Sequence, residues 1–169
     1  MFRQITRTQV SEVRDYPMET LFGVKGASKA AEVIREVAKK GNAKICCIGE
    51  QGTGKTMMLK SILYDLACFE EKEAYDEAKS SEDFKLALSR KCKYFTVAAV
   101  DVNELITILR EHHKGTLPSM LVVTCSLTEN GKKHVSSIDE ITEFEGETVV
   151  NNIITIHKDK YTKVAELTI

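Results

Sequence analysis

The chain has 169 residues, of which 43% are hydrophobic and 29% are charged, with two prolines and nine glycines. This composition excludes a disordered, collagen-like or low-complexity chain and fits one folded domain. Because 24 basic residues face 25 acidic ones, the net charge of −1 excludes a globally basic nucleic-acid-binding protein, and we predict no direct nucleic-acid binding.

Neither a membrane span nor a metal cluster is indicated by the sequence. No apolar run approaches the roughly 20 residues needed to cross a bilayer, and the first residues lack the apolar stretch of a secretory signal. The cysteines form no C-x-x-C pair and lie mostly in apolar segments, so we expect reduced core residues in a cytoplasmic protein.

The first part of the chain alternates between helical and strand patterns. Residues 1–26 have no clear periodicity and are treated as an N-terminal extension to one domain over residues 27–169. Apolar residues at helical spacing predict a helix over 28–40, and the short apolar run over 43–48 predicts a strand buried on both faces. After a glycine-rich segment, residues 57–69 return to helical spacing.

The middle of the chain continues this alternation. The charged stretch Glu70–Lys79 is interpreted as the solvated face of a helix. Ser80–Asp83 has the pattern of a capping box that opens a short helix. Residues 94–100 then predict a second buried strand, and residues 101–111 another amphipathic helix.

From about residue 119 onward, strands follow one another without helices. Asn130–Gly131 predicts a type I′ hairpin turn, and further turns are expected at Gly146 and at Lys158–Asp159–Lys160. The expected strands cover residues 120–128, 135–144, 148–157 and 161–169. The sequence therefore predicts an α/β fold whose last part, about 119–169, is an antiparallel β-meander.

One motif is specific. Gly49-Glu50-Gln51-Gly52-Thr53-Gly54-Lys55-Thr56 fits the phosphate-binding pattern G-x-x-x-x-G-K-[ST] at every fixed position. Its glycines let successive backbone N–H groups face phosphate oxygens, and the helix that follows adds its positive N-terminal end. Lys55 is expected to bridge the β- and γ-phosphates and Thr56 to bind Mg²⁺. With Met57, these residues form the predicted nucleotide site.

The acid that should complete this site is less evident in the sequence. The apolar run over 95–100 ends in Asp101, which is a candidate for holding Mg²⁺ or its water, with Glu104 as a candidate catalytic residue. The same Asp101-x-x-Glu104 pattern is also that of an N-terminal helix cap. Both interpretations stay open at this point.

The order of these motifs resembles the C-terminal ATPase core of the type II/type IV secretion and pilus-type traffic ATPases. AKICCIG followed by GEQGTGKTMMLKSIL is similar to that family's strand, phosphate loop and helix. Two further segments, residues 83–109 and 121–150, are similar to its later strand and helix and to its closing hairpin. The resemblance implies a RecA-like P-loop NTPase core, ATP and Mg²⁺ as ligands, a hexamer, and partners among secretion-system proteins at the inner face of the membrane.

The sequence also departs from the family pattern. Ala98 and Ala99 stand where the family has Gly-Glu at its Walker B strand. The family's histidine box is missing, and residues 1–26 stand in place of its large N-terminal domain. The resemblance thus describes a shortened, degenerate relative that binds ATP and hydrolyses it weakly or not at all.

Three alternatives remain open at the level of the sequence. The first is a competent ATPase in which Asp101 is the acid on the metal side, and either Glu104 or an acid from Asp76–Asp83 activates water. The second is a scaffold or regulatory subunit that offers an exposed strand edge for partner binding. The residues of this edge are Val150, Ile153, Ile154 and Ile156, and the alternative interpretation is that they belong to the core. The third is a small kinase, which the position of the loop and the scarcity of arginines after it disfavour.

Overall fold

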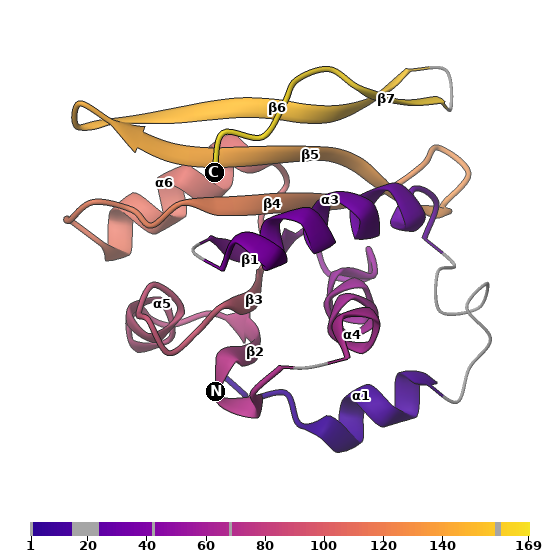
Figure 1. Cartoon of the computed structure of the whole chain (residues 1–169), viewed down its shortest axis with the longest axis horizontal. Coiled ribbons are helices and arrows are strands. Elements are labelled where there is room, and N and C mark those ends of the chain that lie inside the picture. The colour runs from indigo at the N-terminus through magenta and orange to yellow at the C-terminus, as the bar shows by residue number, and fades with distance from the viewer. Residues whose placement is uncertain (1, 15–23, 42, 68, 158–159) are drawn as a thin grey trace.

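The computed structural model describes residues 2–14, 24–41, 43–67, 69–157 and 160–169 (Figure 1). The helices in chain order are α1 (Arg7–Arg14), α3 (Ala27–Lys40), α4 (Lys55–Leu66), a 3₁₀ turn (Glu71–Glu73), α5 (Ser81–Ala87) and α6 (Val102–His112). The strands are β1 (Lys44–Ile48), β2 (Ala74–Ala78), β3 (Tyr94–Val97), β4 (Met120–Leu127), β5 (Lys133–Phe144), β6 (Glu147–His157) and β7 (Lys160–Lys163).

All seven strands belong to one sheet in the order β2-β3-β1-β4-β5-β6-β7. The first four strands of this order are parallel, and β5, β6 and β7 extend the sheet with antiparallel pairing. Parallel strands need crossover connections, which the helices supply, whereas the antiparallel strands follow one another through short turns. The predicted α/β core with a closing β-meander is confirmed.

Helices cover both faces of the parallel strands. The α1, α3 and α4 side chains share one apolar cluster with Ile45 and Cys47, while α5 and α6 share a second cluster with Cys46 and Ile48. Side chains on a strand alternate between faces, so β1 contributes to both cores and all five of its residues are buried. In Figure 1, α3 and α4 lie in front of the sheet and α6 behind it.

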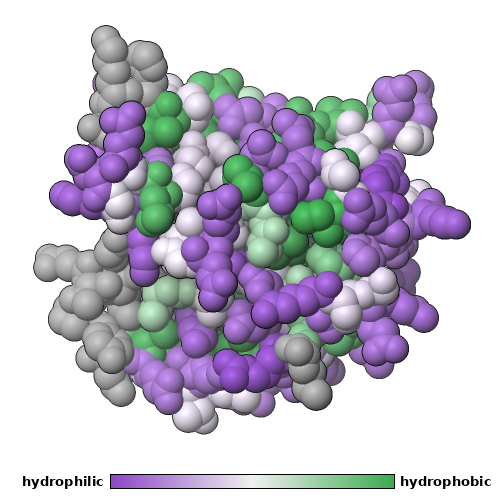
Figure 2. All heavy atoms as spheres, turned by 180° about the vertical axis from the view of Figure 1, so that it is seen from behind, coloured by the Kyte–Doolittle hydropathy of each residue, from purple (hydrophilic) through white to green (hydrophobic). Residues whose placement is uncertain are grey.

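The face of the molecule that lies behind the view of Figure 1 is mostly polar. Figure 2, seen from behind, shows a largely hydrophilic face on which small apolar areas are scattered among charged side chains. Among the described residues no helix has the length and apolar character needed to cross a membrane.

The N-terminal residues before α1 pair with the free edge of β2. The Ile5 amide donates to the Ala74 carbonyl at 2.8 Å, and the Asp76 amide donates to the Arg3 carbonyl at 2.7 Å. The Phe2 ring stacks on the Tyr75 ring with a centroid distance of 4.8 Å. This segment therefore lies against the same sheet as the phosphate-binding motif, although its sequence showed no clear pattern.

The charged stretch Glu70–Lys79 does not form the predicted α-helix, so this prediction is wrong. It forms the 3₁₀ turn and then β2, whose terminal residues Ala74 and Ala78 are buried. Two alanines four positions apart are enough to seat a short strand beside β3, and pairing within the sheet overrides the helical preference of the charged residues. The capping box on Ser80 is confirmed, since its side chain accepts from the Asp83 amide and Asp83 reciprocates.

The turns of the meander also differ from prediction. A type I′ turn needs positive φ at both central residues, and Asn130 lacks it. The Gly131 amide instead donates to the Thr128 carbonyl at 2.8 Å, so Glu129 and Asn130 are the central residues of that turn. The two-residue turn with both φ positive is Glu145–Gly146, at 52° and 81°. Of the turn expected at Lys158–Asp159–Lys160, the first two residues lie outside the described part.

The last residues do not continue as a strand beyond Lys163, contrary to the expected strand over 161–169. They cross back over the sheet, where the Thr168 amide and hydroxyl donate to the fully buried Glu140 carboxylate. Burial acts to raise the Glu140 pKa, but hydrogen bonds from Asn151 and Thr168 outweigh it and hold the pKa below its usual value. A buried carboxylate thus anchors the C-terminal residues.

The strand edge considered for partner binding is largely closed. Ile153 and Ile154 are buried in the core, and Ile154 and Ile156 lie in the part of β6 that pairs with β7. The interpretation as core residues is correct for Ile153 and Ile154, and only Val150 of these four residues is exposed.

Candidate functional site

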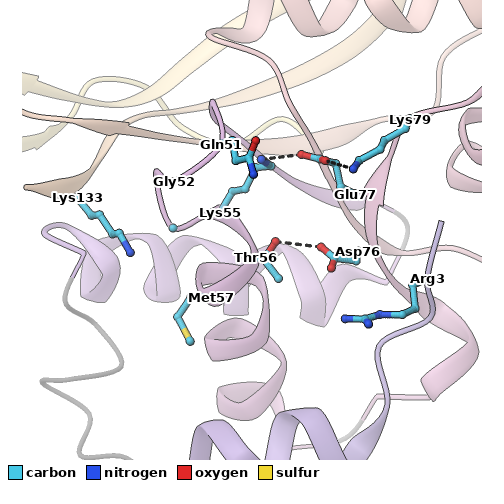
Figure 3. A pocket seen from close by; sticks show the side chains of 11 residues that line it. Arg3, Gln51, Gly52, Lys55, Thr56, Met57, Asp76, Glu77, Lys79 and Lys133 are labelled. Atoms are coloured by element: carbon cyan, nitrogen blue, oxygen red, sulfur yellow. Dashed lines mark hydrogen bonds and ion pairs between the residues drawn. The ribbon is translucent and has the colours of Figure 1, made fainter. Parts of the chain in front are cut away.

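A cavity of about 500 Å³ opens where β1 passes into α4 (Figure 3). Its lining comes from the phosphate loop, the start of α4, β2 with the residue that follows it, the N-terminal segment and β5. The lining residues are Arg3, Gln51, Gly52, Gly54, Lys55, Thr56, Met57, Asp76, Glu77, Lys79 and Lys133. Six of the nine residues predicted from the motif therefore line one cavity, and the other three, Gly49, Glu50 and Thr53, belong to the loop that shapes it.

The loop depends on glycine at specific positions. A Cβ on Gly49 would lie 2.3 Å from the Thr53 hydroxyl and 2.6 Å from the Cys125 carbonyl oxygen, so only glycine fits there. The Thr53 hydroxyl in turn donates to the Glu50 carbonyl at 2.7 Å, which closes the loop on itself. Gly54, with a left-handed φ of 88°, caps α4 without any side-chain hydrogen bond. The first amides of this helix thus have no side-chain cap, as an anion-binding helix terminus requires.

Lys55 lies at the floor of the cavity and is only 6% exposed. Its ammonium pairs with the Glu77 carboxylate of β2 at 2.7 Å, and Lys79 pairs with the same carboxylate at 3.3 Å. Burial acts to raise the Glu77 pKa, but the hydrogen bonds and positive charges of Lys55 and Lys79 outweigh it and hold the pKa below its usual value. Glu77 is therefore an ionised carboxylate beside the lysine that should bind phosphate.

Thr56, the expected Mg²⁺ ligand, also contacts β2. Its hydroxyl donates to the Asp76 carboxylate at 2.9 Å. Hydroxyl and carboxylate oxygens are the ligand types that Mg²⁺ prefers, usually with phosphates and waters completing its shell. In the described part of the chain no cluster of three or more His, Cys, Asp or Glu side chains forms a metal cage. A site of this kind fits a cation that arrives with a phosphate ligand.

The two acids singled out by the spacing argument, Asp101 and Glu104, are elsewhere. The Asp101 side chain accepts from the Glu104 amide at 2.9 Å and so caps α6, while the Glu104 carboxylate accepts from the Val100 amide. Both side chains are exposed, and neither is among the described residues that line the cavity. The capping interpretation is confirmed, and the structure does not bring these carboxylates to the phosphate loop.

Cations dominate the cavity. Arg3, Lys55, Lys79 and Lys133 line it together with the acids Asp76 and Glu77, which leaves two more positive than negative side chains. Figure 3 shows Lys133 and Arg3 entering from opposite sides of the loop. An excess of positive charge around uncapped helix amides suits a polyanion such as a nucleoside triphosphate.

Sequence reasoning missed Arg3, Lys79 and Lys133 and included Asp76 and Glu77 only within a broad range. The two acids could have been noticed in the sequence, since they form an adjacent Asp-Glu pair within the charged stretch 70–79, just before the capping box. Arg3 and Lys133 had none, because strand pairing and a hairpin bring them to the loop from residues far along the chain.

The cysteines take no part in this chemistry. Four of them, at positions 46, 47, 92 and 125, are free and buried, and Cys68 lies outside the described residues. Burial raises the pKa of Cys92 and of Cys125 to about 12, so both thiols stay protonated at neutral pH.

Comparison with known protein families finds a match to part of the chain. Residues 20–95 match the family model described as magnesium chelatase, subunit ChlI, a P-loop NTPase family of the AAA+ class. The matched region contains α3, β1, the phosphate loop, α4, β2 and α5, and it is less than half of the chain. No curated protein matches the chain. The match, the parallel sheet and the loop geometry agree on a P-loop nucleotide-binding protein with the P-loop NTPase fold.

Proposed function

We propose that this protein binds ATP with Mg²⁺ and hydrolyses it, with Asp76 on the metal side and Glu77 on the water side of the γ-phosphate. One observation carries the proposal: β2 brings two carboxylates onto the two reactive side chains of the phosphate loop, Glu77 to Lys55 and Asp76 to Thr56. The carboxylates belong to a strand that the sheet fixes rigidly, as a catalytic site requires.

Thr56 and Asp76 would hold Mg²⁺ together with the nucleotide's β- and γ-phosphates. When bound, the cation supplies positive charge against the charge that develops on the phosphate oxygens. Lys55 and the amides at the start of α4 bind the same oxygens and fix their position.

Bound phosphate changes the partner of Lys55. The ammonium that pairs with Glu77 without nucleotide is expected to turn toward the γ-phosphate, which leaves the Glu77 carboxylate free to accept a proton from water. The water oxygen then bonds to the γ-phosphorus, the bond from that phosphorus to the β–γ bridging oxygen breaks, and ADP and inorganic phosphate leave. General-base assistance of this kind contributes about 10²–10⁴-fold in rate.

The experiment compares nucleotide binding and phosphate release by the wild-type chain, Lys55→Ala and Lys133→Ala. We expect saturable binding of a fluorescent ATP analogue that strengthens with Mg²⁺ and is lost in Lys55→Ala. Lys133→Ala removes a cation from the cavity rim, so a much weaker effect separates a specific site from general electrostatic attraction. Equal binding by the wild type and Lys55→Ala would refute nucleotide binding at this loop.

Binding without efficient hydrolysis is the second candidate function, and the double pairing of Glu77 favours it. If Lys55 and Lys79 both stay on Glu77 when ATP is bound, the carboxylate cannot take a proton. Steady-state phosphate release decides between the two functions: binding with no release above background supports the second. Adenine is inferred from the resemblance to secretion ATPases alone, so GTP is titrated beside ATP.

The relation to secretion ATPases, and with it a hexamer and secretion-system partners in the cytoplasm, is part of the proposal. The order of motifs supports it, whereas the family match supports only the broader P-loop NTPase class. Light scattering across a concentration series, with and without Mg²⁺ and a non-hydrolysable ATP analogue, tests it. A monomer under every condition would favour a protein that works outside a ring.

A further inference from the structure

We propose that Arg3 binds the γ-phosphate side of the nucleotide, so that the N-terminal segment makes the site selective for triphosphate over diphosphate. This inference rests on the proposed function and names a residue that neither the loop motif nor the family match includes, since the match begins at residue 20.

The N-terminal segment is held on β2 from both sides of Arg3. The Arg3 carbonyl accepts from the Asp76 amide at 2.7 Å, and the Ile5 amide donates to the Ala74 carbonyl at 2.8 Å. Phe2 stacks on Tyr75, and Ile5 is only 1% exposed, so the chain is anchored on both sides of Arg3. The backbone of Arg3 is therefore fixed next to Asp76.

Arg3 itself lines the cavity. Figure 3 shows its side chain leaving the N-terminal segment and extending toward the opening in which Thr56 and Asp76 meet. In the described part of the chain no carboxylate forms an ion pair with its guanidinium, unlike Lys55 and Lys79, which both pair with Glu77. Arg3 is thus a cation at the cavity whose charge is not already taken by a protein acid.

The position next to Asp76 assigns Arg3 to one end of the nucleotide. Asp76 bonds to Thr56, whose hydroxyl marks where Mg²⁺ joins the β- and γ-phosphates. A Cβ added to Gly54 would lie 3.1 Å from the Lys133 side chain, so Lys133 lies beside the loop, and Figure 3 shows it on the other side of the loop from Arg3. A guanidinium presents two parallel N–H donors to phosphate oxygens, and the γ-phosphate has the oxygens that ADP lacks.

The test is calorimetric titration with a non-hydrolysable ATP analogue and with ADP, both with Mg²⁺. We expect Arg3→Gln to weaken binding of the ATP analogue about 10–100-fold, the range of one charge-assisted hydrogen bond, and to leave ADP binding nearly unchanged. Arg3→Lys should retain part of the affinity, because it keeps the positive charge but lacks the two parallel N–H donors of the guanidinium. Arg7→Gln is the matched control, since it removes the same charge from the neighbouring helix at a residue outside the cavity lining.

The outcomes separate this inference from the proposed function. If the wild type and Arg3→Gln bind the ATP analogue equally while Lys55→Ala does not bind, Arg3 has no such role and the proposed function stands. Equal loss of ATP-analogue and ADP affinity in Arg3→Gln also overturns the assignment to the γ-phosphate. If the wild type binds neither ligand, both proposals fall. Thermal unfolding of each variant checks that replacing the exposed Arg3 side chain leaves the fold intact.

Discussion

β2 and β3 lie side by side in the parallel half of the sheet and run in the same direction, yet they serve the phosphate loop differently. β2 is short and polar at its centre, and it places Asp76 and Glu77 on Thr56 and Lys55. β3 is entirely buried, continues into Ala98 and Ala99, and its acid Asp101 caps the next helix. An acid near the end of a strand is therefore no guide to the site unless its residue lies level with the loop.

The register explains this difference. Thr96 of β3 pairs with Cys47 of β1 and with Glu77 of β2, so these three residues lie at one level and on one face of the sheet. Asp101 follows five residues after Thr96 and belongs to the turn into α6. At the level of the loop β3 offers a hydroxyl, and the carboxylate comes from the strand beyond it.

The largest expected effect is on ATP turnover, and it distinguishes Glu77 from Glu104. Glu77→Gln should lower ATP turnover about 10²–10⁴-fold because it removes the proton acceptor, whereas Glu104→Gln should leave turnover unchanged. Steady-state phosphate release at saturating Mg²⁺ and ATP measures both. Nucleotide affinity serves as the control, since Glu77→Gln frees Lys55 for phosphate and must not weaken binding. A large loss in Glu104→Gln with none in Glu77→Gln would restore the acids that follow β3 as the catalytic pair.

The next effect concerns the metal side of the site. Asp76→Asn should reduce the Mg²⁺ dependence of nucleotide affinity, with a loss of about 10–100-fold in the apparent affinity for Mg²⁺, because the Thr56 hydroxyl loses its charged acceptor. Asp101→Asn keeps a good helix cap and is the matched change on the other acid. Titration of Mg²⁺ at fixed nucleotide gives the result. A shift in Asp101→Asn and none in Asp76→Asn would reverse the assignment.

A smaller effect is expected in stability without nucleotide. Glu77→Gln leaves the buried Lys55 ammonium without its carboxylate partner and should cost about 1–3 kcal/mol. The pKa of Glu77 is lowered in the folded state, so this stabilisation is fully present above the pKa of the unfolded chain. It is lost as the pH falls through the folded-state pKa.

Chemical unfolding of the wild type and of Glu77→Gln from neutral to acidic pH tests this sign. The difference between the two free energies of unfolding should shrink as the pH falls. Glu104→Gln provides the control, because its carboxylate is exposed and pairs with no cation among the described residues. A difference that is constant with pH would mean that the Lys55–Glu77 pair does not form in solution.

These contrasts show what could be predicted from the sequence. The loop, its strand and its helix were predictable because glycine positions, Lys55 and Thr56 follow a local pattern whose chemistry is fixed. The α/β order with a closing meander followed from local periodicity. β2 was misread because a five-residue strand between two charged segments has too few apolar positions to show a period, and only pairing with β3 reveals it.

The remaining site residues depend on contacts between distant parts of the chain. Arg3 reaches the loop because residues 2–5 add to β2, and Lys133 because a hairpin returns β5 beside the loop. Strand register is a property of the whole sheet, since a slip of one residue would move Glu77 to the opposite face. Asp101 is a second example. Its role as a helix cap could be predicted from four consecutive residues, whereas its distance from the phosphate loop depends on the whole sheet.

The smallest expected effect on stability comes from replacing two buried hydroxyls. The same two substitutions also test directly whether β3 contributes a side chain to the site beside β2. The Thr96 and Thr124 hydroxyls are buried without a hydrogen-bond partner among the described residues. Thr96 shares the face of Cys47 and Glu77, whereas Thr124 pairs with Ile48 and shares the opposite face. Replacing a partnerless hydroxyl by a methyl group of the same shape is nearly neutral or stabilising, so both Thr96→Val and Thr124→Val should unfold within about 1 kcal/mol of the wild type.

Turnover distinguishes the two valine variants. A hydroxyl beside Glu77 has a partner to meet once Lys55 leaves that carboxylate for phosphate, so Thr96→Val should lower ATP turnover several-fold while Thr124→Val keeps the wild-type rate. The variant would lose a hydrogen bond to a charged group, and such bonds contribute about 1.5–3 kcal/mol. This energy sets the upper limit of the expected loss of turnover. Equal turnover in both variants would mean that β3 contributes only its buried backbone to the site and that β2 alone carries the acid chemistry.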